Sequence, residues 1–206
     1  MAKEGYPFLF TSLIATFIAY WIWPYLAVPF GLFTLFTAYF FRDPERTAPL
    51  DAQLLVSPAD GKIVEIAALS QNPFVEGKVT RVGIFMSPFN VHVNRSPVRG
   101  IVKDVRYFPG KYLMAMKEKA SEDNERNAVI MDCEAGGARI AFVQIAGFIA
   151  RRILCYVKPG DKLDKGERFG IIRFGSRVDV YLPESMDIQV KMGEVVRAGE
   201  TVLAKM

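Results

Sequence analysis

The N-terminal stretch from Tyr6 to Phe41 contains no Asp, Glu, Lys or Arg, whereas the rest of the chain is charged throughout. About 20 apolar residues are enough to cross the roughly 30 Å hydrocarbon core of a bilayer. Pro24, near the middle of the stretch, disfavours one continuous helix. We therefore predict an N-terminal hydrophobic helical hairpin, with helices at about Phe8–Trp23 and Tyr25–Phe41, that is fully spanning or re-entrant.

Positive charges flank this stretch, with Lys3 before it and Arg42 and Arg46 after it. By the positive-inside rule, a hairpin would leave both of its ends in the cytoplasm. The alternative is a cleaved signal peptide, but the apolar run is too long for one and no A-x-A site follows it. The sequence thus predicts a membrane hairpin at residues 1–46 and a domain at residues 47–206, on the cytoplasmic side of the cell membrane.

The cysteine count and the net charge narrow the cellular compartment and the binding partners of the protein. Cys133 and Cys155 are the only cysteines, which are too few for a disulfide scaffold and are not spaced as a metal-binding pair. We therefore expect a reducing compartment and no metal site. The net charge of +4 suits either anionic lipid or nucleic acid, and the apolar N-terminus favours lipid.

From Leu50 onward, short apolar runs are interrupted by Gly, Pro, Asn and Asp, a pattern typical of a mainly β, β-rich α+β domain. The expected strands are Lys62–Ala67, Val79–Met86, Ile101–Tyr107, Ala128–Cys133, Arg139–Gln144 and Arg177–Leu182. One helix is expected at Lys111–Lys119. The polar stretch Ala120–Asn127 that follows it has no apolar anchor, so we expect it to be mobile, either as a lid or as a solvated loop.

An internal repeat lies near the C-terminus, where Val157–Glu167 and Val190–Glu200 share the pattern V-K-x-G-[DE]-x-[LV]-x-x-G-E. Each glycine allows the positive φ of a tight turn. The paired units resemble the barrel-sandwich or duplicated hybrid motifs of biotinyl and lipoyl carriers. No lysine stands in the exposed turn that those carriers need, so the likeness concerns architecture alone.

Three residues could carry chemistry. His92 is the only histidine, so any imidazole acid/base role must fall to it. Asp60 lies in the turn Ser57-Pro58-Ala59-Asp60-Gly61, which would hold a carboxylate rigidly, and Ser176 follows a flexible Gly175. Carboxylate, imidazole and hydroxyl together can activate a weak nucleophile, although each alone is equally compatible with a structural role. The spacing does not determine whether the three meet.

Taken together, these segments resemble phosphatidylserine decarboxylase proenzymes of the short bacterial and archaeal type, along nearly the whole chain. The segments that carry the resemblance are Phe41–Arg46, Ser57–Gly61, Phe85–Arg95, Gly110–Tyr112, Asn124–Asn127, Gly147–Ile153 and Phe174–Ser176. Each of these motifs is weak by itself, but their order and combination are specific.

The resemblance implies that the chain cuts itself between Gly175 and Ser176. Ser176 would attack the carbonyl of Gly175, with His92 as the base and Asp60 orienting it. Elimination would then leave a β chain, residues 1–175, and an α chain, residues 176–206, as a heterodimer of undetermined higher oligomeric state. The first residue of the α chain would become a covalent pyruvoyl group, the cofactor.

The resemblance further implies that the pyruvoyl ketone forms a Schiff base with membrane phosphatidylserine and serves as electron sink while CO2 leaves, which yields phosphatidylethanolamine. Arg95 and Lys111 are the candidate cations for the lipid phosphate or the serine carboxylate. Longer family members carry a second His three residues before the one matched here, where this chain has Phe89. The proton donor is therefore either His92 or a carboxylate, a lysine or water.

Two other functions use the same residues. A membrane-anchored serine protease could use Asp60, His92 and Ser176 to cut other proteins. A non-enzymatic adaptor of a membrane transport complex could use the C-terminal hybrid motif. Self-cleavage at Ser176 distinguishes the decarboxylase from both.

Overall fold

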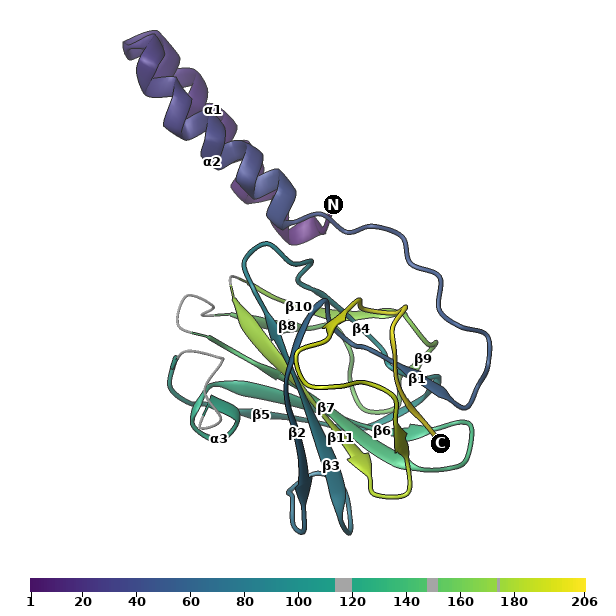
Figure 1. The fold of residues 1–206 in the computed structure, drawn as a ribbon. Coiled ribbons are helices and arrows are strands. Elements are labelled where there is room, and N and C mark those ends of the chain that lie inside the picture. Colours follow the sequence, from purple (N-terminus) through teal and green to yellow (C-terminus); the bar gives the residue numbers. More distant parts are fainter. Residues whose placement is uncertain (114–119, 148–151, 174) are drawn as a thin grey trace. The chain divides into compact units, whose positions relative to one another are not determined.

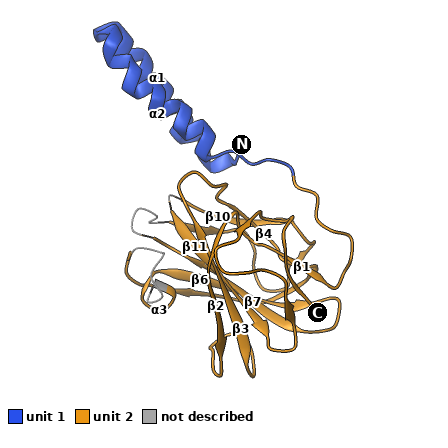
Figure 2. Cartoon of the chain, viewed as in Figure 1, with its two compact units in different colours: residues 1–45 blue, residues 46–206 orange. Residues whose placement is uncertain are grey.

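A computed structural model describes residues 1–113, 120–147, 152–173 and 175–206 (Figure 1). The chain forms two compact units, Met1–Glu45 and Arg46–Met206 (Figure 2). The helix expected at Lys111–Lys119 falls mostly on residues 114–119, outside the described residues.

The first unit is the expected helical hairpin. Its elements are η1 (Lys3–Gly5), α1 (Tyr6–Ile22), η2 (Pro24–Leu26) and α2 (Ala27–Phe40). Pro24 opens η2 after an extended Trp23, so the helix breaks where the proline predicted a break. The segment Lys3–Ile22, with 20 residues, is long and apolar enough to cross a membrane, whereas Pro24–Phe40 is a shorter apolar helix. The hairpin is therefore compatible with membrane association.

Small and hydroxyl-bearing residues line the contact between the two helices. The Oγ1 atoms of Thr16 and Thr34 lie 3.1 Å apart, and Gly31 faces the Thr16 methyl group. Large apolar side chains such as Trp21 and Tyr25 are exposed. This distribution is typical of membrane helices, in which small residues let the backbones approach while bulky ones face lipid.

The second unit is built from three antiparallel sheets. An eight-stranded sheet has the order β13-β2-β3-β11-β7-β6-β5-β9, and two three-stranded sheets have the orders β4-β10-β8 and β1-β14-β12. Besides the short helix α3 (Ala120–Asp123), its elements are β1 (Leu54–Val56), β2 (Gly61–Leu69), β3 (Val79–Met86), β4 (Val93–Arg95), β5 (Gly100–Phe108), β6 (Arg126–Cys133), β7 (Arg139–Ile145), β8 (Ile153–Cys155), β9 (Lys162–Leu163), β10 (Arg168–Ile172), β11 (Ser176–Pro183), β12 (Asp187–Ile188), β13 (Val195–Val196) and β14 (Val202–Lys205).

The expected mainly β fold and the six expected strands are confirmed, as β2, β3, β5, β6, β7 and β11. Both faces of the central strands are buried. On β6, Val129 and Met131 point into the main core, whereas Ala128 and Ile130 belong to a second apolar cluster on the opposite face. Burial on both sides explains why these strands are continuous apolar runs rather than alternating ones.

The C-terminal repeat forms two equivalent turns. All four of its glycines have positive φ, namely Gly160 (93°), Gly166 (80°), Gly193 (84°) and Gly199 (77°). The first glycine of each copy docks on a strand through its N–H, which donates to Val102 in one copy and to Ile63 in the other, both at 2.8 Å. The duplicated architecture expected from the repeat is therefore present.

The duplication extends to a second motif, which was not predicted from the sequence. Ser57–Gly61 and Ser96–Gly100 are both Ser-Pro-x-x-Gly turns. The carbonyl of Ser57 accepts the N–H of the second glycine of one repeat copy, and the carbonyl of Ser96 accepts its counterpart, both at 2.8 Å. Asp60 occupies the place at which the other half carries Arg99, so this candidate catalytic carboxylate is particular to one half.

The prediction that Ala120–Asn127 is mobile was wrong for its second half. Asn124 is fully buried, and its side-chain amide donates to the carbonyls of Leu113 at 2.9 Å and Ala146 at 2.8 Å. Arg126 then begins β6. The stretch has no apolar anchor, but amide hydrogen bonds hold it instead, which hydrophobicity does not reveal.

Candidate active site

The candidate cleavage site lies where β11 begins. Gly175 has φ +71°, a left-handed conformation that favours glycine, and Ser176 is the first residue of the strand. Ser176 is fully buried, and its Oγ lies 3.3 Å from Sδ of Met86, the residue opposite it on β3. The hydroxyl is therefore enclosed, with a thioether, a weak acceptor, as its neighbour.

His92 contacts the same peptide segment. It precedes β4 and is fully buried. Its Nδ1 lies 2.9 Å from the carbonyl oxygen of Asn90, and its Nε2 lies 3.2 Å from the backbone nitrogen of Gly175. A carbonyl can only accept and an N–H can only donate, so Nδ1 carries the proton and Nε2 offers its lone pair. In this tautomer the unprotonated nitrogen, Nε2, accepts the N–H of Gly175, the residue before Ser176.

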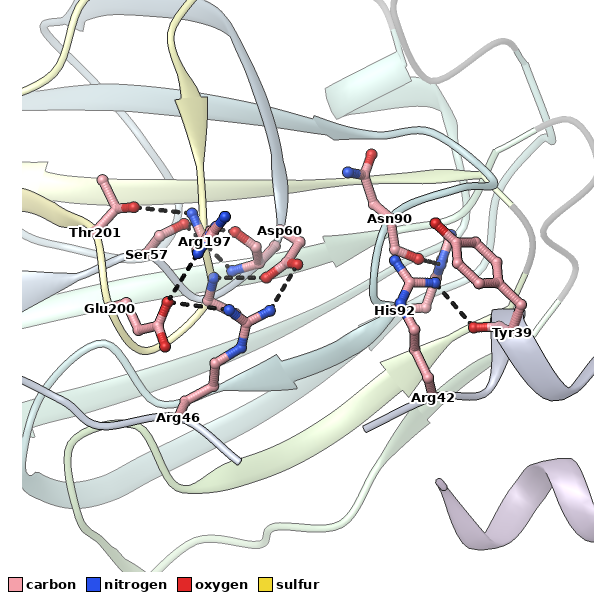
Figure 3. Close-up of polar contacts among 12 residues, drawn as sticks. Tyr39, Arg42, Arg46, Ser57, Asp60, Asn90, His92, Arg197, Glu200 and Thr201 are labelled. Atoms are coloured by element: carbon pink, nitrogen blue, oxygen red, sulfur yellow. Dashed lines mark hydrogen bonds and ion pairs between the residues drawn. The ribbon is translucent and has the colours of Figure 1, made fainter. Parts of the chain in front are cut away.

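Asp60 is held firmly, by groups other than the imidazole. Its Oδ1 accepts the N–H of Ala198 at 2.8 Å, and its Oδ2 lies 3.0 Å from Nη2 of Arg46 (Figure 3). Arg46 also pairs with Glu200 at 3.0 Å. Among the described residues, the polar contacts found for Asp60 are with Arg46 and Ala198. The structure thus brings His92 to Gly175, the residue before Ser176, but shows no bond from Asp60 to His92.

The two candidate substrate cations differ in their surroundings. Arg95 is buried, and its Nη1 donates to the carbonyl of Gly166 at 2.9 Å, which ties β4 to the first repeat copy. Lys111 is exposed, with its Nζ 3.7 Å from Asp123. Their role in binding substrate stays a prediction, and Lys111 is the more accessible of the two.

A buried chain of polar side chains, which was not predicted from the sequence, lies beside Ser176. Asn94 donates toward Met86 Sδ at 3.8 Å, and Gln144 donates to Asn94 Oδ1 at 2.9 Å. Both amides are fully buried. A lone glutamine within the apolar run Ile140–Ile145 was the available signal, because a buried amide needs a partner.

The burial of the charged side chains of β11 was not predicted either. Arg177 and Asp179 are buried together with Glu65 of β2 and Arg81 of β3. Burial alone would raise the pKa of Glu65, but hydrogen bonds from Arg177 and Arg81 outweigh it and hold that pKa below its usual value. For fully buried Asp179, desolvation raises the pKa in spite of Arg177 beside it. These four residues are called the buried charge cluster below.

The cysteines are poor nucleophiles in the folded domain, because burial raises the pKa of Cys133 to about 12 and also raises that of Cys155. At pH 8 only about one Cys133 in ten thousand is a thiolate. We expect iodoacetamide at pH 8 to label Cys133 in denatured but not in native protein, as measured by peptide mass spectrometry. Fast native labelling would show that this part of β6 opens readily.

No group of three or more His, Cys, Asp or Glu suited to holding a metal occurs in the part of the chain that the structure describes.

Comparison with known proteins identifies the family. The family model for phosphatidylserine decarboxylase matches residues 33–204. A phosphatidylserine decarboxylase proenzyme of Ralstonia nicotianae is 48% identical over 212 residues, covering 100% of this chain and 95% of the relative. Proenzymes of the same name from Solidesulfovibrio magneticus and Burkholderia mallei are 49% and 45% identical, with the same coverage.

These matches show the class of protein first: the chain is an enzyme, a decarboxylase. More particularly, it belongs to the phosphatidylserine decarboxylase family, as its motifs indicated. This result favours the decarboxylase over the trans-acting protease and the transport adaptor.

Proposed function

We propose that this chain cuts itself between Gly175 and Ser176 and then uses a pyruvoyl group formed from Ser176 to convert phosphatidylserine into phosphatidylethanolamine and CO2 at the membrane. The observation that carries the proposal is the 3.2 Å contact between Nε2 of His92 and the backbone nitrogen of Gly175. It puts the only imidazole of the chain against Gly175, the residue whose carbonyl belongs to the peptide bond that must be cut.

In the first step Ser176 Oγ adds to the carbonyl carbon of Gly175, the peptide C–N bond breaks, and the hydroxyl proton passes through His92 to the departing nitrogen. The product is an ester. The hydroxyl and the carbonyl belong to adjacent residues, so rotation of the serine side chain away from Met86 is the main movement required. His92, which is buried and aligned by the carbonyl of Asn90, is proposed to transfer that proton.

In the second step a base removes the α-proton of residue 176, the Cβ–Oγ bond breaks, and Gly175 leaves as a carboxylate. The dehydroalanyl residue that remains takes up water and releases ammonia, which leaves a ketone at the start of residues 176–206. Asp60 is proposed to support His92 in these steps. Its firm hold by Arg46 and Ala198 supplies the rigidity that such a role requires.

The residues around Ser176 fit a small carbonyl group. The position is fully buried, beside Met86 and near the amide of Asn94, so bulk water is excluded. A pyruvoyl carbonyl there would supply the electron sink that loss of CO2 requires and that no ordinary side chain provides. His92 is the proposed proton donor to the substrate carbon, with a carboxylate, a lysine or water as the alternatives.

The apolar N-terminal unit supports a membrane lipid as the substrate. A hairpin with an apolar 20-residue span would hold the domain beside a membrane. With Lys3 on one side and Arg42 on the other, the domain would face the cytoplasm. Exposed Lys111 and buried Arg95 are the proposed contacts for the lipid phosphate or the serine carboxylate. The cut chains, residues 1–175 and 176–206, would remain together as a heterodimer.

The proposal predicts that purified wild-type protein consists of two chains. Intact-mass analysis should find residues 1–175 with an ordinary C-terminus and residues 176–206 with a ketone in place of the serine amine and hydroxyl. Hydroxylamine should add once, to the smaller chain. A single unbroken chain that does not react with hydroxylamine would refute the proposed function, and would favour a serine enzyme that keeps its hydroxyl.

A further inference from the structure

The buried charge cluster lies on one face of three neighbouring strands. Asp179 on β11 is opposite Gly83 on β3, which is in turn opposite Glu65 on β2. Arg177 precedes Asp179 by two residues, so both side chains point to the same side of the sheet. Arg177 is also the residue directly after Ser176.

Arg177 is the centre of the cluster. Its Nη2 lies 2.5 Å from Oε2 of Glu65, and its Nε lies 2.5 Å from Oδ1 of Asp179. Arg81 pairs with the other oxygen of Glu65, at 2.8 Å from its Nε. The sheet also makes room for Arg177, because a Cβ at Gly83 would lie 2.4 Å from its Nη2.

Holding strands together with buried charges carries a large desolvation cost. Removing four charges from water costs free energy that their attraction only partly returns, so apolar side chains would often serve stability as well. Oδ2 of Asp179 has no hydrogen-bond partner among the described residues. Neighbouring β7 does use apolar residues, Ala141 and Val143, opposite Tyr181 and Asp179. Stability alone therefore does not account for the charges.

We propose that the buried charge cluster is a positioning device, in which Glu65 of the larger chain holds Arg177 and thereby fixes the cofactor-bearing end of the smaller chain after the cut. This inference rests on the proposed self-cleavage. Arg177 and Asp179 would belong to residues 176–206, whereas Glu65 and Arg81 would belong to residues 1–175. The Arg177–Glu65 pair would thus join the two chains one residue from the reactive carbonyl.

The cut creates the need for such a device. Before the cut, residue 176 is joined to chain on both its N-terminal and its C-terminal side. On the N-terminal side the peptide bond links it to Gly175, whose N–H contacts His92. After the cut, residue 176 is a chain end without its own nitrogen, and ends of strands fray readily. The neighbouring guanidinium, 1% exposed and bound to the other chain, would oppose that fraying.

The test compares hydrogen exchange at the amides of residues 177–180 in cut and uncut protein. Glu65→Gln is made both in the wild-type chain, which cuts itself, and in a Ser176→Ala chain, which stays whole. We expect Glu65→Gln to raise exchange at these amides about tenfold in cut protein, and to change it less than about twofold in uncut protein. The cutting rate, followed by intact mass, should stay within about threefold of wild type, because the device acts after the cut.

Asp132→Asn is the matched control. Asp132 forms a salt bridge with Arg139 across the neighbouring strands β6 and β7 of the same sheet, at 2.6 Å, but that pair is solvent-accessible. Asp132→Asn should change neither hydrogen exchange at residues 177–180 nor the cutting rate. Glu65→Gln leaves Arg177 with less compensating charge, so a double variant, Glu65→Met with Arg177→Met, guards against misfolding by removing one charge of each sign. The double variant should raise hydrogen exchange at residues 177–180 of the cut protein, as Glu65→Gln does.

The outcomes separate the two proposals. Equal loosening of cut and uncut protein, or full protection of residues 177–180 in the cut double variant, would overturn the positioning role while leaving the proposed function intact. A wild-type chain that is never cut would instead overturn the proposed function, and this inference with it.

Discussion

Ser176→Ala protein is expected to accumulate as one unbroken chain of 206 residues with no decarboxylase activity. The substitution removes only Oγ, the atom that both forms the ester and leaves in the elimination. Without it neither the cut nor the ketone can arise, so the loss should be complete rather than partial. Intact mass, hydroxylamine addition and release of CO2 from phosphatidylserine in detergent micelles measure the three consequences separately.

Ser70→Ala is the control for this variant, because Ser70 is exposed at the end of β2, away from the cleavage site. It should cut and decarboxylate like wild type. The Ser176→Ala chain should remain folded, because its buried hydroxyl has only a thioether neighbour to lose. Release of CO2 by the unbroken Ser176→Ala chain would show that the ketone is not the catalytic group.

The second large effect is expected for His92→Ala, which should slow the cut by about 10²–10⁴-fold, the usual contribution of a positioned general base. Nε2 of His92 lies against the nitrogen of Gly175, so the substitution removes the group proposed to move the serine proton. The rate can be followed as the decay of the full-length mass after synthesis in a cell-free system.

His92→Gln separates proton transfer from simple hydrogen bonding, because glutamine can accept the N–H of Gly175 but cannot serve as a base at neutral pH. It should be nearly as slow as His92→Ala. Asp60→Asn should also slow the cut, since the amide can still accept from Ala198 but loses the charge that pairs with Arg46. Rapid cutting by His92→Gln would assign the histidine a structural role.

Local patterns were enough to predict most of the secondary structure. The uncharged stretch with Pro24 predicted the hairpin and its break, because a proline cannot sit inside a helix without disrupting it. The spacing of apolar runs and turn residues predicted β3 to the residue. The glycines of the repeat predicted their own positive φ angles, since this conformation is costly for other residues.

The site was predictable only in part. His92 and Ser176 could be named because one is the only histidine and the other follows a glycine before a strand, and the structure brings their segments together. The partners of Asp60 could not be named. Arg46 is 14 residues away and Ala198 is 138 residues away, and no local pattern encodes such separations.

The amino-acid sequence by itself determined the hairpin, the six longest strands, the turns of the repeat and the identity of the candidate catalytic residues. These features depend on backbone preference and on composition within a few residues. Only the tertiary structure decided what packs against the face of β11 that carries Arg177 and Asp179. Its alternating pattern is compatible with a solvated polar face, yet Arg177 is buried against Glu65, 112 residues earlier in the chain. Alternation divides a strand into two faces, but strand order and register determine what covers each of them.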